Sequence, residues 1–306
     1  TLERPKTIIT RNTSPDIPFD RSINPYRGCE HGCVYCFARP THAYHGLSPG
    51  LDFESKLFAK PDAAALLEAE LRKPNYHPQT IAIGTNTDPY QPIEKDHRIM
   101  RGVLEVLDAY NHPVSIVTKS AMICRDLDIL SAMAERSLVG VGVSVTTLDR
   151  DLARTMEPRA ATPPKRLETI RTLTGAGIPV ACMAAPMIPG LNDHELETIL
   201  EAGVNAGAKA GEYILLRLPL EIKDLFIEWL EAHVPNRKSK VLAMMRESRD
   251  GGLYVVDSGV SADYPPEGAR RSRVPKSQRT LHNFTSRQMM TKGDFVRNHV
   301  HICTPR

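Results

Sequence analysis

NPYRGCEHGCVYCFARP, residues 24–40, holds three cysteines within eight residues. They are Cys29, Cys33 and Cys36, in the spacing C-x-x-x-C-x-x-C. Thiols so close in sequence converge only if the backbone reverses between them, and Gly28 and Gly32 permit tight turns because they lack a Cβ. The stretch therefore predicts a loop that holds a ligand between its sulfurs.

Thiolates are soft ligands that favour zinc, copper(I) and iron–sulfur clusters. A [4Fe-4S] cluster is normally held by four cysteines, so three would leave one iron open to a small molecule. A structural zinc ion is one alternative, although such a site usually shows a second Cys or His pair nearby. His31 lies inside the loop, but it is two residues from both Cys29 and Cys33 and is badly placed to reach the same ion. Buried thiols without a metal are the other alternative.

The cysteine spacing, the aromatic Tyr35 before the third cysteine and the position near the N-terminus resemble the signature of the radical S-adenosylmethionine superfamily. In that superfamily the amino and carboxylate groups of S-adenosylmethionine chelate the open iron of a [4Fe-4S] cluster. The resemblance implies cleavage to methionine and a 5'-deoxyadenosyl radical, with an external electron donor of the flavodoxin or ferredoxin type. It implies that Cys29, Cys33 and Cys36 are the metal ligands and the catalytic centre.

The composition bounds the class of protein. The 306 residues are 41% hydrophobic and 25% charged, which is typical of a globular chain that buries a large core. The net charge of +3 permits a nucleic-acid partner without calling for one. No apolar run nears the roughly 18 residues of a membrane span, and the first residues lack the apolar core of a signal peptide. With clustered cysteines, these features favour a cytoplasmic location and no membrane partner.

Beyond the cysteines, apolar runs of strand length alternate with helical patterns. The predicted strands are 22–27, 79–84, 113–120, 138–147, 178–186 and 212–219. The predicted helices among them are 62–74, 98–110, 127–136, 164–175 and 194–206. Near-continuous apolar strands separated by helices indicate a buried parallel sheet. Six such units predict an α/β fold, a partial (β/α)6 barrel of the TIM type with a C-terminal extension.

The chain is expected to divide into three parts. Residues 1–21 are polar, contain three prolines and predict an irregular N-terminal arm. Residues 22–220 form the barrel that carries the radical chemistry. Residues 221–306 are predicted to be an extension that closes the open side of the barrel. Helices are expected in it over 221–233, 239–249 and 281–299.

Function in such a barrel gathers at the carboxyl ends of the strands. The second strand ends in GTNTDPYQPIE, which resembles a segment of the spore photoproduct lyase-like group, the DNA repair photolyase homologues. The resemblance implies that this segment offers acceptors to the ammonium of S-adenosylmethionine. A polar turn begun by Asp88 and Pro89 is the alternative. The polar residues of the segment are Thr85, Asn86, Thr87, Asp88, Gln91 and Glu94.

Other predicted cofactor contacts lie in the cysteine loop and at later strand ends. The resemblance implies that Lys119 meets the carboxylate of S-adenosylmethionine and that Ser144 bonds its carboxylate or ribose. A solvated lysine and a serine bonded to its own backbone are the alternatives. The turn that begins at Met187 could lie along the adenine. The backbone of Tyr35 and Phe37 is expected to pair with the same base, and core packing is the alternative for both aromatic rings.

The chain departs from the lyase-like group at the hydrogen-atom donor. That group uses a cysteine just before the polar segment, and Thr85 stands at the matching position. Its O–H bond is too strong for that role, and Cys124 and Cys182 are either replacements or packed residues. The sequence therefore argues against repair of thymine dimers and leaves the substrate open among DNA, RNA, a peptide and a small molecule.

Two basic features would suit a phosphate. Arg159 could grip one with its planar fork or pair with Glu157. The run at 270–279 could bind a nucleic-acid backbone or be a solvated loop. The alternative from another functional class is a non-catalytic zinc protein that interacts with nucleic acid.

Overall fold

The structure is a computed structural model that describes residues 1–13 and 19–248. Its centre is a seven-stranded sheet in the order β1-β2-β5-β6-β7-β8-β9. The strands are β1 (Ile9–Arg11), β2 (Arg21–Ile23), β5 (Ile81–Ile83), β6 (Val114–Thr118), β7 (Val139–Ser144), β8 (Val180–Met187) and β9 (Ala210–Leu215). Strand β1 is antiparallel to β2, and every other pair is parallel. Six parallel strands in sequential order confirm the predicted partial TIM-type barrel.

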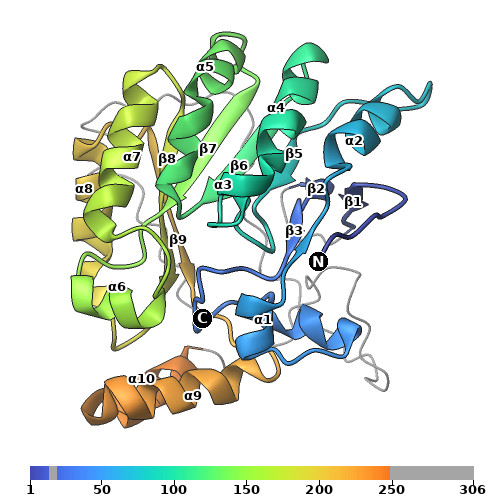
Figure 1. The fold of residues 1–306 in the computed structure, drawn as a ribbon. Coiled ribbons are helices and arrows are strands. Elements are labelled where there is room, and N and C mark those ends of the chain that lie inside the picture. The colour runs from blue at the N-terminus through green and yellow to red at the C-terminus, as the bar shows by residue number, and fades with distance from the viewer. Residues whose placement is uncertain (14–18, 249–306) are drawn as a thin grey trace.

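Helices follow the strands and cover one face of the sheet, as Figure 1 shows for α4, α5, α7 and α8. The helices of the barrel are α2 (Ala63–Leu71), α3 (Glu94–His97), α4 (Ile99–Ala109), α5 (Leu127–Glu135), α6 (Arg150–Met156), α7 (Pro163–Gly175) and α8 (Leu196–Asn205). Two short 3-10 turns are η2 (Ala121–Asp126) and η3 (Asp193–Glu195). The five predicted helices are confirmed as α2, α4, α5, α7 and α8. The short α3 and α6 are additional to the prediction.

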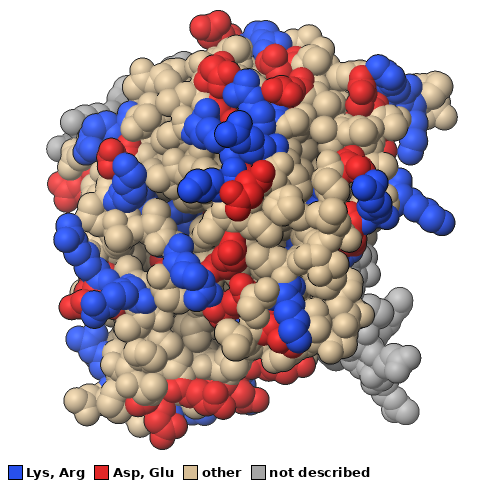
Figure 2. Space-filling model, in the orientation of Figure 1, with Lys and Arg blue, Asp and Glu red and all other residues tan. Residues whose placement is uncertain are grey.

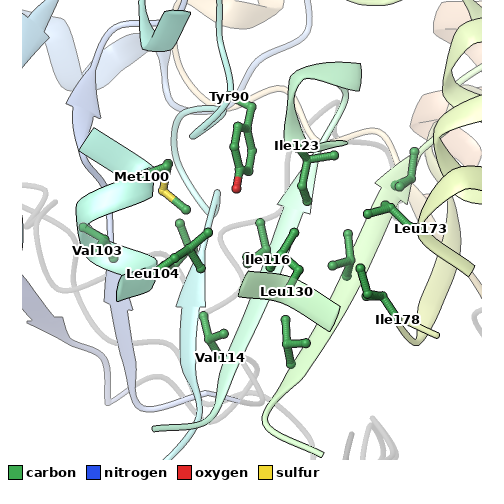
Figure 3. Packing of buried hydrophobic residues seen from close by; sticks show 14 of the residues in the cluster. Tyr90, Met100, Val103, Leu104, Val114, Ile116, Ile123, Leu130, Leu173 and Ile178 are labelled. Atoms are coloured by element: carbon green, nitrogen blue, oxygen red, sulfur yellow. The ribbon is translucent and has the colours of Figure 1, made fainter. Parts of the chain in front are cut away.

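The main core lies between the sheet and these helices. Figure 3 shows Ile116 of β6 on the side of the sheet that faces Leu104 of α4, and both are buried. Alternate strand residues point toward the helices, and β-branched side chains suit such a packed sheet surface. The apolar runs in the sequence are therefore explained by burial against the helices.

Replacing Ile116 with valine is expected to lower the free energy of unfolding by about 1 kcal/mol, because it removes one methylene from a closed core. Urea unfolding followed by circular dichroism measures the change. The matched variant is Ile214→Val on β9, where the side chain is exposed, and its effect should stay within about 0.5 kcal/mol. Equal losses in the two variants would contradict this assignment of the core.

The opposite face of the sheet carries small residues. Ala82, Ser115 and Gly140 are paired across β5, β6 and β7, and Gly142 and Ala181 are paired across β7 and β8. A Cβ placed on Gly140 would meet no atom within 4 Å. There is thus room beside Gly140 near the start of β7, whereas a Cβ on Gly142 farther along the strand would lie 2.6 Å from the sulfur of Met183.

The N-terminal residues are more regular than predicted, because β1 adds an antiparallel edge to the sheet. The predicted first strand is interrupted at Pro25, which lacks the N–H that a central strand needs. The chain resumes as β3 (Tyr26–Arg27), which pairs with β4 (Phe58–Ala59) in a separate two-stranded sheet. The crossover that showed no periodicity holds η1 (Arg39–His45) and α1 (Leu51–Ser55).

Helices α9 (Ile222–His233) and α10 (Pro235–Glu247) lie side by side beneath the sheet in Figure 1. Phe226 and Leu230 belong to a buried cluster with Cys33 and Tyr35, so the extension packs on the cysteine loop. Helix α10 begins earlier than predicted, with proline at its first position, where the missing N–H costs nothing. The boundaries at 21 and 220 stay predictions, and the helix expected over 281–299 lies outside the described residues. Within the described ranges, none of the helices has both the length and the apolar character that a bilayer crossing requires.

Candidate functional site

The cysteine loop leads from β3 to η1 beneath the sheet (Figure 1). Gly28 and Gly32 have left-handed backbone, with φ of 75° and 68°. A Cβ on Gly28 would lie 2.7 Å from the backbone oxygen of Phe53, and one on Gly32 would lie 2.5 Å from Nη2 of Arg159. The two expected turns are present. The left-handed backbone favours glycine at both positions, and at Gly28 the nearby backbone oxygen of Phe53 also excludes a Cβ.

The three loop cysteines are free thiols. Cys29 is 8% exposed, Cys33 is 9% exposed and Cys36 is half-buried. Burial raises the pKa of the Cys29 thiol well above its usual value, and Asp88, Cys33 and Cys36 add to that rise. Burial also raises the pKa of Cys33 to about 12. The thiols are near enough to affect one another, and binding a cationic centre would have to displace their protons.

The loop offers three thiols as its donor set. A tetrahedral zinc ion holds each sulfur at about 2.3 Å, which brings the sulfurs within about 4 Å of one another. In residues 1–13 and 19–248, no group of three or more His, Cys, Asp or Glu side chains is arranged to hold one metal ion. Three soft thiols suit an iron–sulfur cluster with one iron free of protein ligands.

The polar residues after β5 are tied to the strand ends around them. The backbone N–H of Asn86 donates to Asn24 Oδ1 at 3.2 Å, and Thr85 Oγ1 lies 3.5 Å from the same oxygen. Thr87 Oγ1 donates to the backbone oxygen of Tyr26 at 3.1 Å. Thr85 to Thr87 thus line the ends of β2 and β5, and their predicted contact with an ammonium group stays a prediction.

Asp88 is the acceptor at the centre of this region. Its carboxylate accepts hydrogen bonds from Thr118 Oγ1 and the Lys119 backbone N–H, each at 2.7 Å, and lies 3.4 Å from Nδ1 of His31. Burial alone would raise the pKa of Asp88, but His31 and these donors hold it at about 2. The carboxylate therefore joins β5, β6 and the cysteine loop, and it is charged at neutral pH.

Lys119 follows β6 and reaches the cysteine loop. Its Nζ lies 5.9 Å from the centre of the Tyr35 ring. Its charge lowers the pKa of the Cys33 and Cys36 thiols, against the larger effect of burial. The structure thus places the Lys119 cation beside the cysteines. Contact between Lys119 and the carboxylate of S-adenosylmethionine stays a prediction.

Tyr35 is held by a buried charged pair. Its hydroxyl donates to Glu157, which also accepts from Thr146 Oγ1 at 2.8 Å and from the guanidinium of Arg166. Burial alone would raise the pKa of Glu157, but Arg166 and Lys119 hold it at about 2. The aromatic residue before the third cysteine is thereby anchored to the end of β7.

The remaining predicted contacts have different surroundings. Ser144 is buried at the end of β7 and donates to the backbone oxygen of Ala185 at 2.9 Å. Met187 is buried at the end of β8. Phe37 is 56% exposed beside Cys36, so core packing does not explain it. The cofactor roles proposed for the three residues stay predictions.

Neither replacement for the missing cysteine donor lies with the loop cysteines. Cys182 is buried, and a Cβ on Gly203 of α8 would come within 2.7 Å of its sulfur, so it faces the helix layer. The pKa of the Cys124 thiol, raised mainly by burial, is also affected by Lys165 and Glu168 of α7. Packing therefore accounts for both thiols. Cys303 lies outside the described residues.

Arg159 pairs with Glu54 and donates to the backbone oxygen of Glu30, whereas Glu157 pairs with Arg166. Arg159 also lines a cavity of about 320 Å³ on the outer side of the cysteine loop, together with His31, Lys95 and Ser120. The alternative pairing of Arg159 with Glu157 is therefore wrong. The basic run at 270–279 lies outside the described residues.

Sequence reasoning missed Arg39 as a support of the loop. Arg39 is buried, and its Nε donates to the backbone oxygen of Cys33 at 2.9 Å. Its Nη1 donates to the backbone oxygens of Pro49 and Gly50, each at 3.0 Å. Two of the backbone oxygens that Arg39 bonds, those of Pro49 and Gly50, lie in a stretch of sequence without periodicity. No sequence pattern therefore indicates that this arginine supports the loop.

Comparison with known proteins adds a family and a fold. Residues 23–203 match the family described as the Radical SAM superfamily. An uncharacterized protein of Mycobacterium tuberculosis is 38% identical over 232 residues, covering 75% of this chain and 68% of the relative. An uncharacterized protein of Methanocaldococcus jannaschii is 29% identical over 173 residues, covering 56% of this chain and 62% of the relative.

Among solved structures, spore photoproduct lyase complexed with dinucleoside spore photoproduct superposes with a TM-score of 0.55. The match is 16% identical and covers 77% of this chain but 66% of the lyase chain. A variant of that lyase has been solved with bound AdoMet, with a TM-score of 0.51. At this identity the match shows a shared fold.

Proposed function

Because the chain belongs to the radical SAM superfamily, we propose that it is an enzyme that abstracts a hydrogen atom from an organic substrate by means of a [4Fe-4S] cluster and S-adenosylmethionine. The observation that carries the proposal is the trio of free thiols in one loop, with Cys29 and Cys33 buried and Cys36 half-buried. When bound, the two groups supply reductive cleavage of a sulfonium, which yields methionine and a 5'-deoxyadenosyl radical.

The protein's own residues hold and orient these groups. Cys29, Cys33 and Cys36 would each bind one iron and leave the last open. Lys119 brings a positive charge to the loop, where it would neutralise the carboxylate of S-adenosylmethionine. A buried, water-poor setting strengthens such a pair and limits side reactions.

Further contacts are proposed at the strand ends. Thr85, Asn86, Thr87 and Asp88 would surround the ammonium of S-adenosylmethionine, and Ser144 would bond its carboxylate or ribose. Tyr35, Phe37 and Met187 would lie along the adenine. The exposed ring of Phe37 beside Cys36 supports this arrangement.

The substrate would enter at the carboxyl ends of the strands, where Asp88 joins the ends of β5 and β6 to the cysteine loop. A nucleic acid is one candidate class, since the lyase named above binds a dinucleoside photoproduct. On the helix-covered face, Figure 2 shows Lys and Arg interspersed with Asp and Glu. That face thus offers no continuous basic surface for a phosphate backbone, and a nucleic acid would have to bind elsewhere.

The test is anaerobic reconstitution with iron and sulfide, followed by reduction with dithionite in the presence of S-adenosylmethionine. Mass spectrometry should detect 5'-deoxyadenosine and methionine. A preparation with a full complement of iron and sulfide that releases neither product would refute the proposed function. A colourless protein with one zinc ion per chain would favour the alternative zinc protein.

Lys119→Met should weaken binding of S-adenosylmethionine by about 10-fold to 100-fold, because a hydrogen bond between charged groups contributes about 1.5–3 kcal/mol. Equilibrium dialysis on the reconstituted protein measures the dissociation constant. Lys73→Met is the matched control, since Lys73 is exposed just after α2, and it should bind as the parent does. Unchanged affinity in Lys119→Met would remove this lysine from the cofactor site.

A further inference from the structure

The segment after β5 contacts the cysteine loop through Gln91. This side chain is fully buried. Its Nε2 donates to the backbone oxygen of Gly28 at 3.1 Å, and its Oε1 accepts from the backbone N–H of Glu30 at 2.9 Å. Gly28 and Glu30 are the neighbours of Cys29 on either side, so one side-chain amide spans the backbone around this cysteine.

A second contact runs in the opposite direction. The carboxylate of Glu30 accepts from the backbone N–H of Ile93 at 2.5 Å. The backbone N–H of Cys29 itself donates to the oxygen of Phe53 at 2.9 Å. The backbone around Cys29 is therefore fixed by partners that are distant in sequence.

Gln91 is itself held in place. Its backbone N–H donates to the oxygen of Asp88 at 3.3 Å, and its oxygen accepts from the N–H of Glu94 at 2.9 Å. The Glu94 carboxylate is buried and accepts from the hydroxyl of Tyr26 at 2.5 Å. The segment 88–94 is thus a rigid support against which the loop is pressed.

Chemistry restricts which side chain can occupy this position. A primary amide offers both a donor and an acceptor and carries no charge. Glutamate would leave the Gly28 oxygen without a donor and bring a negative charge near Cys29, whereas methionine would leave both backbone groups unpaired. A buried polar group without a partner is costly, so the loop would move to find water.

We propose that Gln91 is a positioning residue that fixes Cys29 in the place where it can share a cluster with Cys33 and Cys36. This inference deepens the proposed function and rests on it for the identity of the cluster. It gives the PYQPIE part of the segment a role distinct from the ammonium contacts proposed for residues 85–88: it holds a cysteine, and it does not touch S-adenosylmethionine.

The first test uses the metal-free protein and needs no cofactor. The native protein is treated with iodoacetamide, and mass spectrometry of its peptides gives the alkylation rate at each cysteine. Gln91→Met should raise the rate at Cys29 by roughly 30-fold, because two net hydrogen bonds of about 1 kcal/mol each are lost and about 1.4 kcal/mol corresponds to a factor of ten. The rate at Cys182, buried against α8, should not change.

The second test uses the reconstituted protein. Gln91→Met should bind no more than about half the iron and sulfide of the parent, and its reduced electron paramagnetic resonance spectrum should be altered. Gln79→Met, at an exposed glutamine, is the matched control and should behave as the parent in both tests. Circular dichroism verifies the fold, and Gln91→Glu, which keeps the acceptor for Glu30, replaces the methionine variant if that variant does not fold.

A folded variant with the parent's Cys29 alkylation rate, iron content and spectrum would overturn the proposal. The two hypotheses fail separately. If the parent binds no cluster but Gln91→Met still exposes Cys29, the radical chemistry is wrong and the positioning role stands. If the parent makes 5'-deoxyadenosine and the variant is indistinguishable from it, the positioning role is wrong.

Discussion

Cys33→Ala is expected to fold, to bind no complete iron–sulfur cluster and to release 5'-deoxyadenosine only at background level. A thiolate is the ligand that an iron of such a cluster needs, and alanine offers none. The variant should lose only about 1 kcal/mol of unfolding free energy, because a small buried side chain becomes smaller without leaving a charge. Iron and sulfide analysis, the visible absorption spectrum and product analysis after reduction measure these effects.

Cys182→Ala is the matched control. Cys182 is as buried as the loop thiols, and burial raises its pKa to about 12. It faces α8, however, and the nearest partner of its sulfur is the backbone oxygen of Ile199 at 3.8 Å. This variant should therefore keep its iron, sulfide and product yield. Full iron content and activity in Cys33→Ala would mean that another residue holds the cluster.

The parallel order of the strands could be predicted because the sheet leaves a strong pattern in the sequence. The run at 138–143 has no polar residue, and β7 is buried along nearly its whole length between two parallel neighbours. The cysteine loop could be predicted because its ligands and glycines are close in sequence. Each of these signals is local.

The supports of the site could not be predicted, because their partners are distant in sequence. Gln91 and Gly28 are 63 residues apart, and nothing in either stretch marks the contact. Glu157 lies two residues from Arg159 but pairs with Arg166, since the turn before α7 brings that guanidinium back to it. Strand β3 could not be told apart from β2, because only Asn24 and Pro25 separate them and the partner of β3, β4, lies about 30 residues further along the chain.

Arg166→Met is expected to be the most destabilising single change near the site. Arg166 is fully buried and pairs with the buried carboxylate of Glu157. Its Nη1 also donates to the backbone oxygen of Ser144 at 3.1 Å, and its Nε to that of Ala161 at 2.6 Å. Removing one partner leaves a buried charge unpaired, which costs about 3–5 kcal/mol.

Urea unfolding at pH 7 measures this loss, and Arg154→Met supplies the control. Arg154 and Asp151 form an exposed pair on α6, so the control should change the stability by less than about 0.5 kcal/mol. The double variant Arg166→Met with Glu157→Leu removes the unpaired charge and should recover part of the loss. Equal effects of Arg166→Met and Arg154→Met would contradict the burial of this pair.

The pair also gives stability an acid dependence. Burial by itself would raise the pKa of Glu157, yet Arg166 and Lys119 hold it at about 2, below its ordinary value of 4.5. A lowered carboxyl pKa contributes stability that is complete above the unfolded value and is lost as the pH falls toward 2. The parent should therefore lose stability between about pH 5 and pH 2.

The double variant lacks the Glu157 carboxyl. Its unfolding free energy should therefore fall less over the same pH range, because the part of the loss that comes from protonating Glu157 is missing. An identical acid profile in the two proteins would show that Glu157 is not held charged by Arg166, and the anchoring of Tyr35 beside the cysteines would then need another cause.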